Sequence, residues 1–185
     1  MKRTLIIVFL MCLCATVFAQ TKEEPKVKVD PMDISRQLEM IEKYGVPTIA
    51  SVDAMKKKAD ALYEAQSWKE AVTAYEAYSK NVNWLANLLS QCVEPYYSAS
   101  YDEKNRFSIF KIKSIVQFER KANECKANRN IAYVKMGLCY KNLGDTKNAV
   151  VYLHKGLDLI GIDETEYWTL ARNAMAEIIQ FTPEK

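Results

Sequence analysis

Glycine and proline are scarce in this chain, at five residues each among 185. So few turn-forming residues argue against a turn-rich β-fold and favour long helices. Histidine is scarcer still, because His154 is the only one, and no HExxH, paired CxxC, P-loop or GxGxxG motif is present. We therefore expect His154 to be a surface residue, and we expect no metal site, no cofactor and no enzymatic activity.

A large excess of charge of either sign is also missing. Lys and Arg number 26 against 23 Asp and Glu, and this near balance argues against a general nucleic-acid binder. The strongest basic segment is residues 104–129, which hold eight basic residues against Glu119 and Glu124. We interpret this segment as a solvated helix that the acidic C-terminal end balances. A basic face that docks on an anionic membrane or an acidic partner is the alternative.

Long apolar runs are absent except near the N-terminus. There an apolar segment, residues 5–18, follows a positively charged start, and Val17 and Ala19 are small residues at the spacing that a signal peptidase requires. These features predict a signal peptide over residues 1–19. The run is shorter than the ~20 residues of a spanning helix, so a transmembrane anchor is the less favoured interpretation.

Two cysteines in the apolar segment, Cys12 and Cys14, raise the alternative of a lipid-modified cysteine, but both follow bulky residues. Residues 20–30 are charged and lack helical periodicity, which predicts a flexible leader. The helical domain is expected over residues 31–185. We expect the mature protein to be periplasmic or secreted and to have no transmembrane segment, while a peripheral association with the cell envelope stays open.

Three cysteines remain after cleavage: Cys92, Cys125 and Cys139. In an antiparallel hairpin that turns near Tyr101, Cys92 and Cys125 would be offset by roughly 20 Å along the helices, which is too far for a disulfide. A bond between Cys92 and Cys139 stays open. We favour buried thiols that act as small apolar side chains.

Short connections divide the mature chain into helices. Gln66–Ser67 and Gly144–Asp145 are turns, Pro95 should kink or end a helix, and Ser100 with Glu103 has the spacing of a capping box. The expected helices are residues 31–44, 52–65, 68–80, 82–98, 100–126, 130–143, 146–159 and 164–181.

One helical pattern occurs twice, 34 residues apart. A bulky residue is followed by an apolar residue three positions on, then a small residue, then another apolar residue. The first copy is Tyr133, Met136, Gly137 and Tyr140, and the second is Tyr167, Leu170, Ala171 and Ala174. A fixed period of this size is typical of stacked helical hairpins.

The paired helices resemble the tetratricopeptide repeat. The best match runs from Asn130 to Asp163, where the first copy of the pattern and the Gly144–Asp145 turn fall at the expected positions. The resemblance implies an all-α, right-handed solenoid of about three helical hairpins, with a short N-terminal helix and a C-terminal capping helix. The 78 residues from Ala59 to Gly137 exceed two periods by ten, and we assign this excess to the middle pair.

The resemblance also implies a concave surface that binds a protein or peptide. Carried over position by position, the partner-binding residues would be Asp53, Lys56, Asp60, Tyr63, Glu64, Lys135, Lys141, Asn142, Trp168 and Arg172. Three apolar positions, Ile131, Val134 and Leu138, either join this surface or pack on the next helix. Two other functions stay open. One is a small-ligand binder or enzyme in the irregular middle, where Cys92 and His154 would converge. The other is a passive oligomerisation scaffold.

Overall fold

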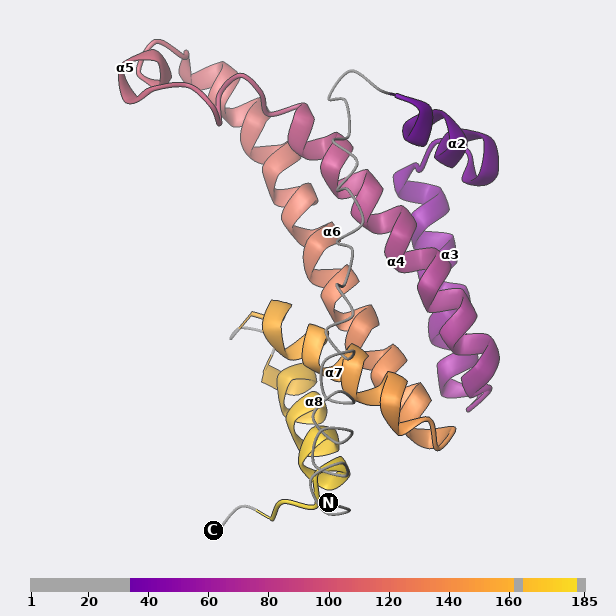
Figure 1. The fold of residues 1–185 in the computed structure, drawn as a ribbon. Coiled ribbons are helices and arrows are strands. Elements are labelled where there is room, and N and C mark those ends of the chain that lie inside the picture. The colour runs from indigo at the N-terminus through magenta and orange to yellow at the C-terminus, as the bar shows by residue number, and fades with distance from the viewer. Residues whose placement is uncertain (1–33, 162–164, 183–185) are drawn as a thin grey trace, which may run out of the picture. The chain divides into compact units, whose positions relative to one another are not determined.

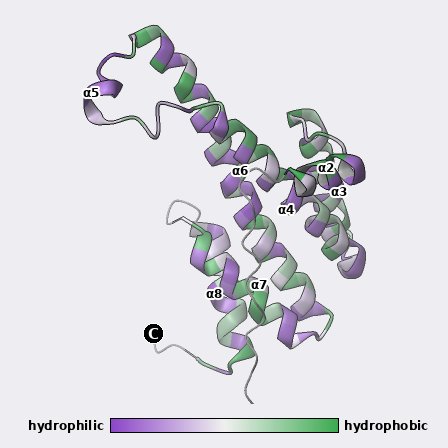
Figure 2. Cartoon of the chain, turned by 45° about the horizontal axis from the view of Figure 1, so that its top comes forward, coloured by the Kyte–Doolittle hydropathy of each residue, from purple (hydrophilic) through white to green (hydrophobic). Residues whose placement is uncertain are grey.

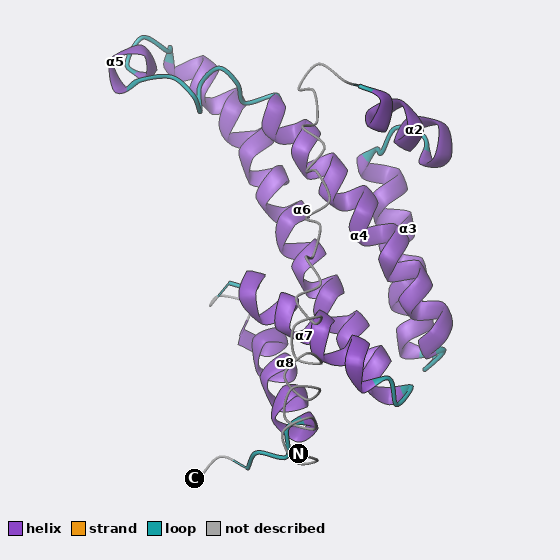
Figure 3. Ribbon diagram, viewed as in Figure 1, coloured by secondary structure: helices purple, strands orange, loops and turns teal. Residues whose placement is uncertain are grey.

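The computed structural model describes residues 34–161 and 165–182, so the predicted signal peptide and leader lie outside the described residues. Every regular element there is a helix, as Figures 1 and 3 show, and the predicted all-α fold of helical hairpins is confirmed. Contacts divide the chain into residues 1–39 and 40–185. The helices are α2 (Ser35–Tyr44), α3 (Ile49–Glu64), α4 (Trp68–Gln91), α5 (Tyr101–Lys104), α6 (Ile109–Asn142), α7 (Thr146–Leu159) and α8 (Thr165–Ile178).

Helix α2 corresponds to the predicted helix over residues 31–44, whose first residues lie outside the described part. It ends at Gly45, which has a positive φ of 70° that glycine tolerates without strain. Ile34, just before the helix, and Leu38 and Ile41 within it are exposed. Their spacing places them on one apolar stripe, and this stripe is not buried.

The first hairpin pairs α3 with the N-terminal half of α4. Thr48 begins α3 through a capping box with Ser51, three residues before the predicted start. The turn after α3 places Gln66 at a positive φ of 57°. Ala59 and Ala71 are fully buried, since small side chains let the two helices approach closely.

Two predicted helix breaks are absent. Helix α4 continues through residue 81, and α6 runs for 34 residues through 127–129. Neither place holds a Gly or Pro, and an asparagine at or beside each place makes a side-chain hydrogen bond that is compatible with the helix. Asn81 donates to the Ala77 carbonyl within α4 (2.8 Å). Asn130 donates to the Leu159 carbonyl at the end of α7 (2.7 Å).

The connection between α4 and α6 differs from the predicted long helix over residues 100–126. Helix α4 ends at Gln91, ahead of Pro95, so the predicted effect of this proline near the helix end is confirmed. The capping box of Ser100 and Glu103 is present but begins only the four residues of α5. The long helix begins later, where the Ser108 hydroxyl accepts from Lys111 N.

We call residues 87–121 the arm and residues 49–86 together with 122–178 the body. In Figure 1 the ends of α4 and α6 that flank α5 extend away from α3, α7 and α8. The middle helical pair is thus the outer half of α4 against the outer half of α6. This pair accommodates the ten extra residues by extending outward.

The second hairpin pairs the C-terminal half of α6 with α7. Its turn uses Gly144 at a φ of 76°, and the Asp145 carboxylate accepts from Asn148 N. The helices nearly touch at Gly137, where an added Cβ would lie 2.7 Å from Leu153 Cγ and 2.9 Å from its backbone nitrogen. The small residue that the repeat pattern predicted is therefore required by packing.

Helix α8 follows α7 and packs against both α7 and α6. It runs in the same direction as the C-terminal half of α6 (Figure 1), as successive first helices of a repeat array do. Ala171 and Ala174 are buried against Val134 and Leu153. Leu170 is 41% exposed, so this member of the repeated pattern does not face inward.

The three cysteines among the described residues are free thiols. Cys125 and Cys139 are buried, as predicted. Burial raises the pKa of Cys139 to about 11, an effect that outweighs the charge of Lys135. Cys92 is exposed, so its predicted burial was wrong. The open alternative of a bond between Cys92 and Cys139 is not realised.

Candidate functional site

Lys135 connects three helices that share one side of the body. Its ammonium lies 2.7 Å from Asp60 Oδ1 on α3. It also lies over three aromatic rings, with centroid distances of 5.3 Å to Tyr63, 5.7 Å to Tyr75 and 5.8 Å to Tyr167. One side chain of α6 thus contacts α3, α4 and α8.

Asp60 is the acceptor at the centre of this group. Besides Lys135, it accepts from Lys56 Nζ at 2.9 Å and from the Tyr75 hydroxyl at 2.6 Å. Partial burial by itself raises the pKa of Asp60, but the hydrogen bonds from Lys135, Tyr75 and Lys56 outweigh it and lower the pKa from 3.8 to about 2. The carboxylate therefore stays ionised near neutral pH.

The tyrosines around Lys135 are fixed by their own contacts. Burial, followed by the hydrogen bond to Asp60, holds the pKa of Tyr75 far above its usual value. The Tyr63 ring packs edge-on against Trp68 and Tyr75, with centroid distances of 5.5 Å and 6.3 Å. We call the resulting group the Lys135 cluster: Lys56, Asp60, Tyr63, Tyr75, Lys135 and Tyr167.

Four of the predicted partner-binding residues meet in this cluster: Lys56, Asp60, Tyr63 and Lys135. Their exposure is graded, since the side chains of Lys135, Asp60 and Lys56 are 15%, 22% and 37% exposed. Among these three side chains, Lys135 is therefore the least accessible to a partner and Lys56 the most accessible.

The remaining predicted residues on α3 and α6 surround or adjoin the cluster. Asp53 and Glu64 are exposed on α3. Lys141 forms an ion pair with Glu177 of α8, and the side-chain amide of Asn142 donates to the Leu138 carbonyl within α6.

The three apolar residues of α6 that could have joined the binding surface pack within the fold instead. Val134 is fully buried in the second core cluster, and Ile131 and Leu138 pack against that cluster. The alternative of packing on the next helix holds for all three.

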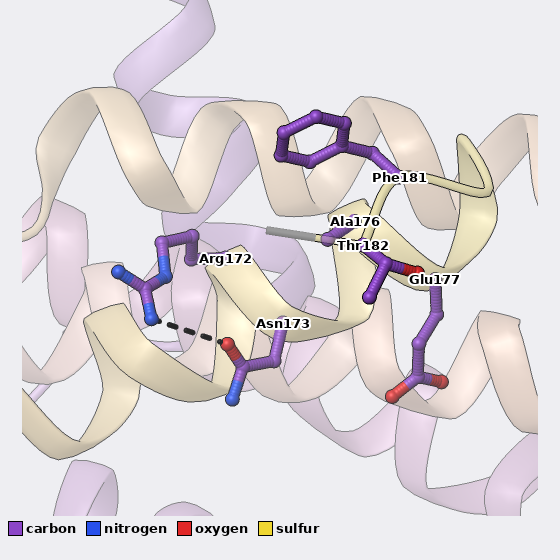
Figure 4. Close-up of a pocket in the computed structure, with 6 residues that line it drawn as sticks. All are labelled: Arg172, Asn173, Ala176, Glu177, Phe181 and Thr182. Carbon is purple, nitrogen blue, oxygen red and sulfur yellow. Dashed lines mark hydrogen bonds between the residues drawn. The ribbon is translucent and has the colours of Figure 1, made fainter. Parts of the chain in front are cut away.

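Trp168 and Arg172 belong to a different place on α8. The Arg172 guanidinium lies over the Trp168 ring, 4.8 Å from its centroid. In Figure 4, Arg172 lines a pocket of about 500 Å³ and donates to Asn173 at 3.5 Å. The other lining residues are Ala176, Glu177, Phe181 and Thr182. Among the described residues, no hydrogen bond, ion pair or cation–π contact links Trp168 or Arg172 to Lys135.

Sequence reasoning missed Tyr167 and Glu177 as members of these contacts. The 34-residue recurrence contained the signal for Tyr167, because it places this residue at the position of Tyr133 on the next helix. Glu177 had no such signal, since its role depends on the C-terminal end of α6 lying beside α8. Tyr75, which is also outside the predicted partner-binding set, is a core residue that is 1% exposed.

The residues of the enzyme alternative lie on different elements. Cys92 caps the end of α4 in the arm. His154 is on α7, 70% exposed, with Nδ1 3.0 Å from Asp158. Within the part of the chain that the structure describes, no group of three or more His, Cys, Asp or Glu could hold a metal ion. No helix there is long and apolar enough to cross a bilayer.

Comparison with known proteins matches one hairpin of this fold. A sequence model of the tetratricopeptide repeat family matches residues 131–155, which are the C-terminal half of α6 and most of α7. No curated protein and no solved structure is similar enough to count as a match. The second hairpin, which supplies Lys135, is thus similar to a tetratricopeptide repeat in both sequence and packing.

Proposed function

We propose that this chain is a protein-interaction module that binds a peptide or protein segment over the Lys135 cluster. The observation that carries the proposal is the contact of Lys135 with α3, α4 and α8. In stacked hairpin arrays, the first helices of successive repeats form the binding surface. Here α3, the C-terminal half of α6 and α8 are those helices. The tetratricopeptide repeat match supports a protein partner.

The cluster suits binding because its internal charges are already satisfied. Asp60 is held by three donors, so its geometry is set before a partner arrives. Such preorganisation lowers the entropy cost of association. The exposed charges of Asp53 and Glu64 and the half-buried ring of Tyr63 offer hydrogen bonds and a stacking surface to an extended segment.

The proposal includes export of the protein. The apolar segment over residues 5–18 and the small residues before Gln20 support a signal peptide, which would place the module in the periplasm or at the envelope as an adaptor or scaffold. N-terminal sequencing of the protein from its source cells should begin at Gln20. A protein that retains Met1 would remove the export part and leave the binding part standing.

Site-specific photo-crosslinking tests the binding face. A photoreactive amino acid at Glu64, beside the cluster, should give a discrete adduct in source cells. The same residue at Lys147 on α7 should not. Glu64→Arg should weaken capture of that partner several-fold by reversing a rim charge, whereas Glu70→Arg, an equal charge change on α4, should leave it unchanged. Equal adducts at Glu64 and Lys147 would disprove the assigned face.

A second candidate function, self-association through α8, has one supporting observation. Ile179 and Phe181, which follow the end of α8, are 63% and 61% exposed, and Phe181 lines the pocket of Figure 4. Exposed apolar groups of this kind favour an interface. Sedimentation of residues 20–185 should show a dimer that Phe181→Ser dissociates; a monomer at all concentrations would exclude it.

A further inference from the structure

The arm has a small core of its own at its outer end. Val93 is 1% exposed. The rings of Tyr96 and Phe107 meet edge to face with centroids 5.1 Å apart, and the Tyr97 hydroxyl donates to Glu119 of α6. The loop between α4 and α6 therefore has a defined structure, in which some apolar side chains are buried and others are not.

Three large apolar side chains are left outside this core. Tyr101 on α5 is 80% exposed, and Ile109 and Phe110 in the first turn of α6 are 60% and 79% exposed. Val116, two turns further along α6, is 41% exposed. Scattered single apolar residues on a surface are ordinary, but several gathered at one end of an element mark a contact surface.

Basic residues surround these apolar side chains. Residues 104–118 contain four basic residues and no acidic residue: Lys104, Arg106, Lys111 and Lys113. In α6 the spacing places Ile109, Lys113, Val116 and Arg120 along one stripe, at i, i+4, i+7 and i+11. Figure 2 shows hydrophilic and hydrophobic residues interspersed along this part of the helix.

Some basic residues nearer the body are paired within the fold, whereas at the tip Lys104 lies over the Tyr96 ring, 5.7 Å from its centroid. Lys121 pairs with Glu124 at 2.7 Å, and Arg129 donates to Asn83 and Asn130. Among the described residues, no carboxylate forms an ion pair with Arg106, Lys111 or Lys113. The Lys121–Glu124 pair lies within the segment 104–129 itself, so the balance of this segment by the acidic C-terminal end stays a prediction.

Carboxylates close to the tip are engaged by their own loop, with one exception. Glu103 accepts from the Ser100 backbone and hydroxyl at 2.9 Å and 2.8 Å. Glu94 accepts from the Ser98 hydroxyl at 2.7 Å. Asp102 is exposed beside Tyr101. The tip therefore presents a net positive surface in which aromatic and aliphatic side chains are interleaved.

We propose that the tip of the arm docks on an anionic membrane surface. Tyr101, Ile109 and Phe110 enter the boundary between headgroups and acyl chains, where apolar and aromatic side chains are favoured. Lys104, Arg106, Lys111 and Lys113 lie among the lipid phosphates, and each basic residue near such a surface strengthens binding. A bilayer accepts a protruding apolar tip without a matching pocket, which an acidic protein would have to supply.

Vesicle sedimentation of residues 20–185 tests the electrostatic part. This chain lacks the predicted apolar signal peptide over residues 1–19 and keeps every described residue. It should bind vesicles of phosphatidylglycerol and phosphatidylcholine in equal parts, bind pure phosphatidylcholine weakly, and be released by high salt. The double variant Lys111→Glu/Lys113→Glu should lose at least roughly tenfold in binding. The matched control Lys57→Glu/Lys58→Glu, the same charge change on exposed positions of α3, should bind as the wild type does.

A second pair of variants tests the apolar part. Phe110→Ser should weaken vesicle binding several-fold, whereas Val151→Ser, at a 55% exposed position of α7, should not. Phe110→Trp adds a fluorophore that brominated lipids should quench, while Val151→Trp should add unquenched emission. Circular dichroism of each variant establishes that the helices are retained.

Three results would overturn the proposal. The first is equal binding to anionic and neutral vesicles. The second is an equal loss for the α3 and arm charge reversals, which would indicate attraction to the whole protein. The third is binding to soluble polyglutamate without binding to vesicles, which would assign the tip to an acidic protein partner.

Discussion

The body and the arm are built from the same two helices, yet they differ in what they bury. In the body, α4 and α6 bury small residues such as Ala71, Ala86 and Ala132 against large ones such as Met136. In the arm, the same helices leave Leu88, Phe110 and Val116 exposed. The comparison indicates that an uninterrupted helix can pass from a packed repeat into a different kind of surface without any break in its backbone.

The difference also distinguishes residues that stabilise the fold from residues that are free to contact a partner. The buried core residues of the body have almost no solvent-facing area to offer a partner, so their side chains hold the fold together. The exposed apolar residues of the arm bury little area within the fold, so their large side chains need another explanation. Mutations should therefore separate the two regions by the size of their effect on the free energy of unfolding.

The largest effect is expected in the body core. Leu153 is fully buried beside Gly137, and Leu153→Ala should lower the free energy of unfolding by about 3 kcal/mol through lost burial and a cavity. Leu88→Ala, at a 38% exposed position of the arm, should cost less than about 1 kcal/mol. Urea denaturation of both variants measures the comparison, and equal losses would contradict it.

A somewhat smaller effect is expected at Asp60. Its folded pKa, about 2, is below the usual 3.8, so its contribution is present above the unfolded pKa and is lost as the pH falls from about 5 toward 2. Asp60→Asn should be roughly 2 kcal/mol less stable than the wild type near pH 7. Urea titrations across this range should show the gap closing in acid. A constant gap would mean that the ionised carboxylate is not the cause.

A substitution at the closest helix contact should cost less. In Gly137→Ala the new Cβ would lie 2.9 Å from the Leu153 backbone nitrogen, so α6 and α7 must separate slightly. The gain in helix propensity, about 1 kcal/mol, offsets part of the overpacking cost, and a net loss of about 1 kcal/mol remains. Gly161→Ala, where nothing lies within 4 Å, is the control and should leave thermal stability nearly unchanged.

The smallest effect is expected at the tip. Phe110→Ser and Ile109→Ser should each change the free energy of unfolding by less than about 0.5 kcal/mol, because these side chains are already in water. Thermal melts measured beside those of Leu153→Ala provide the contrast. A loss above about 1 kcal/mol would place these residues in a core and remove the distinction between arm and body.

The sequence predicted the body better than the arm for a physical reason. Hairpin turns have local signals, and Gln66–Ser67 and Gly144–Asp145 were both found by turn chemistry alone. The small residue Gly137 was found because it recurs with the repeat period. A small residue is needed at this position because the facing helix, at Leu153, lies very close, and such close approach is typical of helical hairpins of this kind.

Other features depend on contacts that no local pattern encodes. The contact of the C-terminal half of α6 with the end of α7 includes a hydrogen bond from Asn130 to the Leu159 carbonyl, 29 positions away. The membership of Tyr167 in the Lys135 cluster depends on the register of α8 against α6. The sequence had assigned all ten partner-binding positions to one surface. The position of α8 against α6 instead directs Tyr167 toward Lys135, while Trp168 and Arg172 contact each other.

The unbroken course of α6 fixes a spacing. Phe110 at one end and Lys135 further along are 25 positions apart on a single helix, which at 1.5 Å per residue is about 37 Å. A continuous helix of this kind fixes the distance between the two residues. Anything held at the Lys135 cluster stands off from whatever Phe110 touches by a length that the chain itself sets, and removing two turns from both α4 and α6 would shorten that stand-off by about 11 Å.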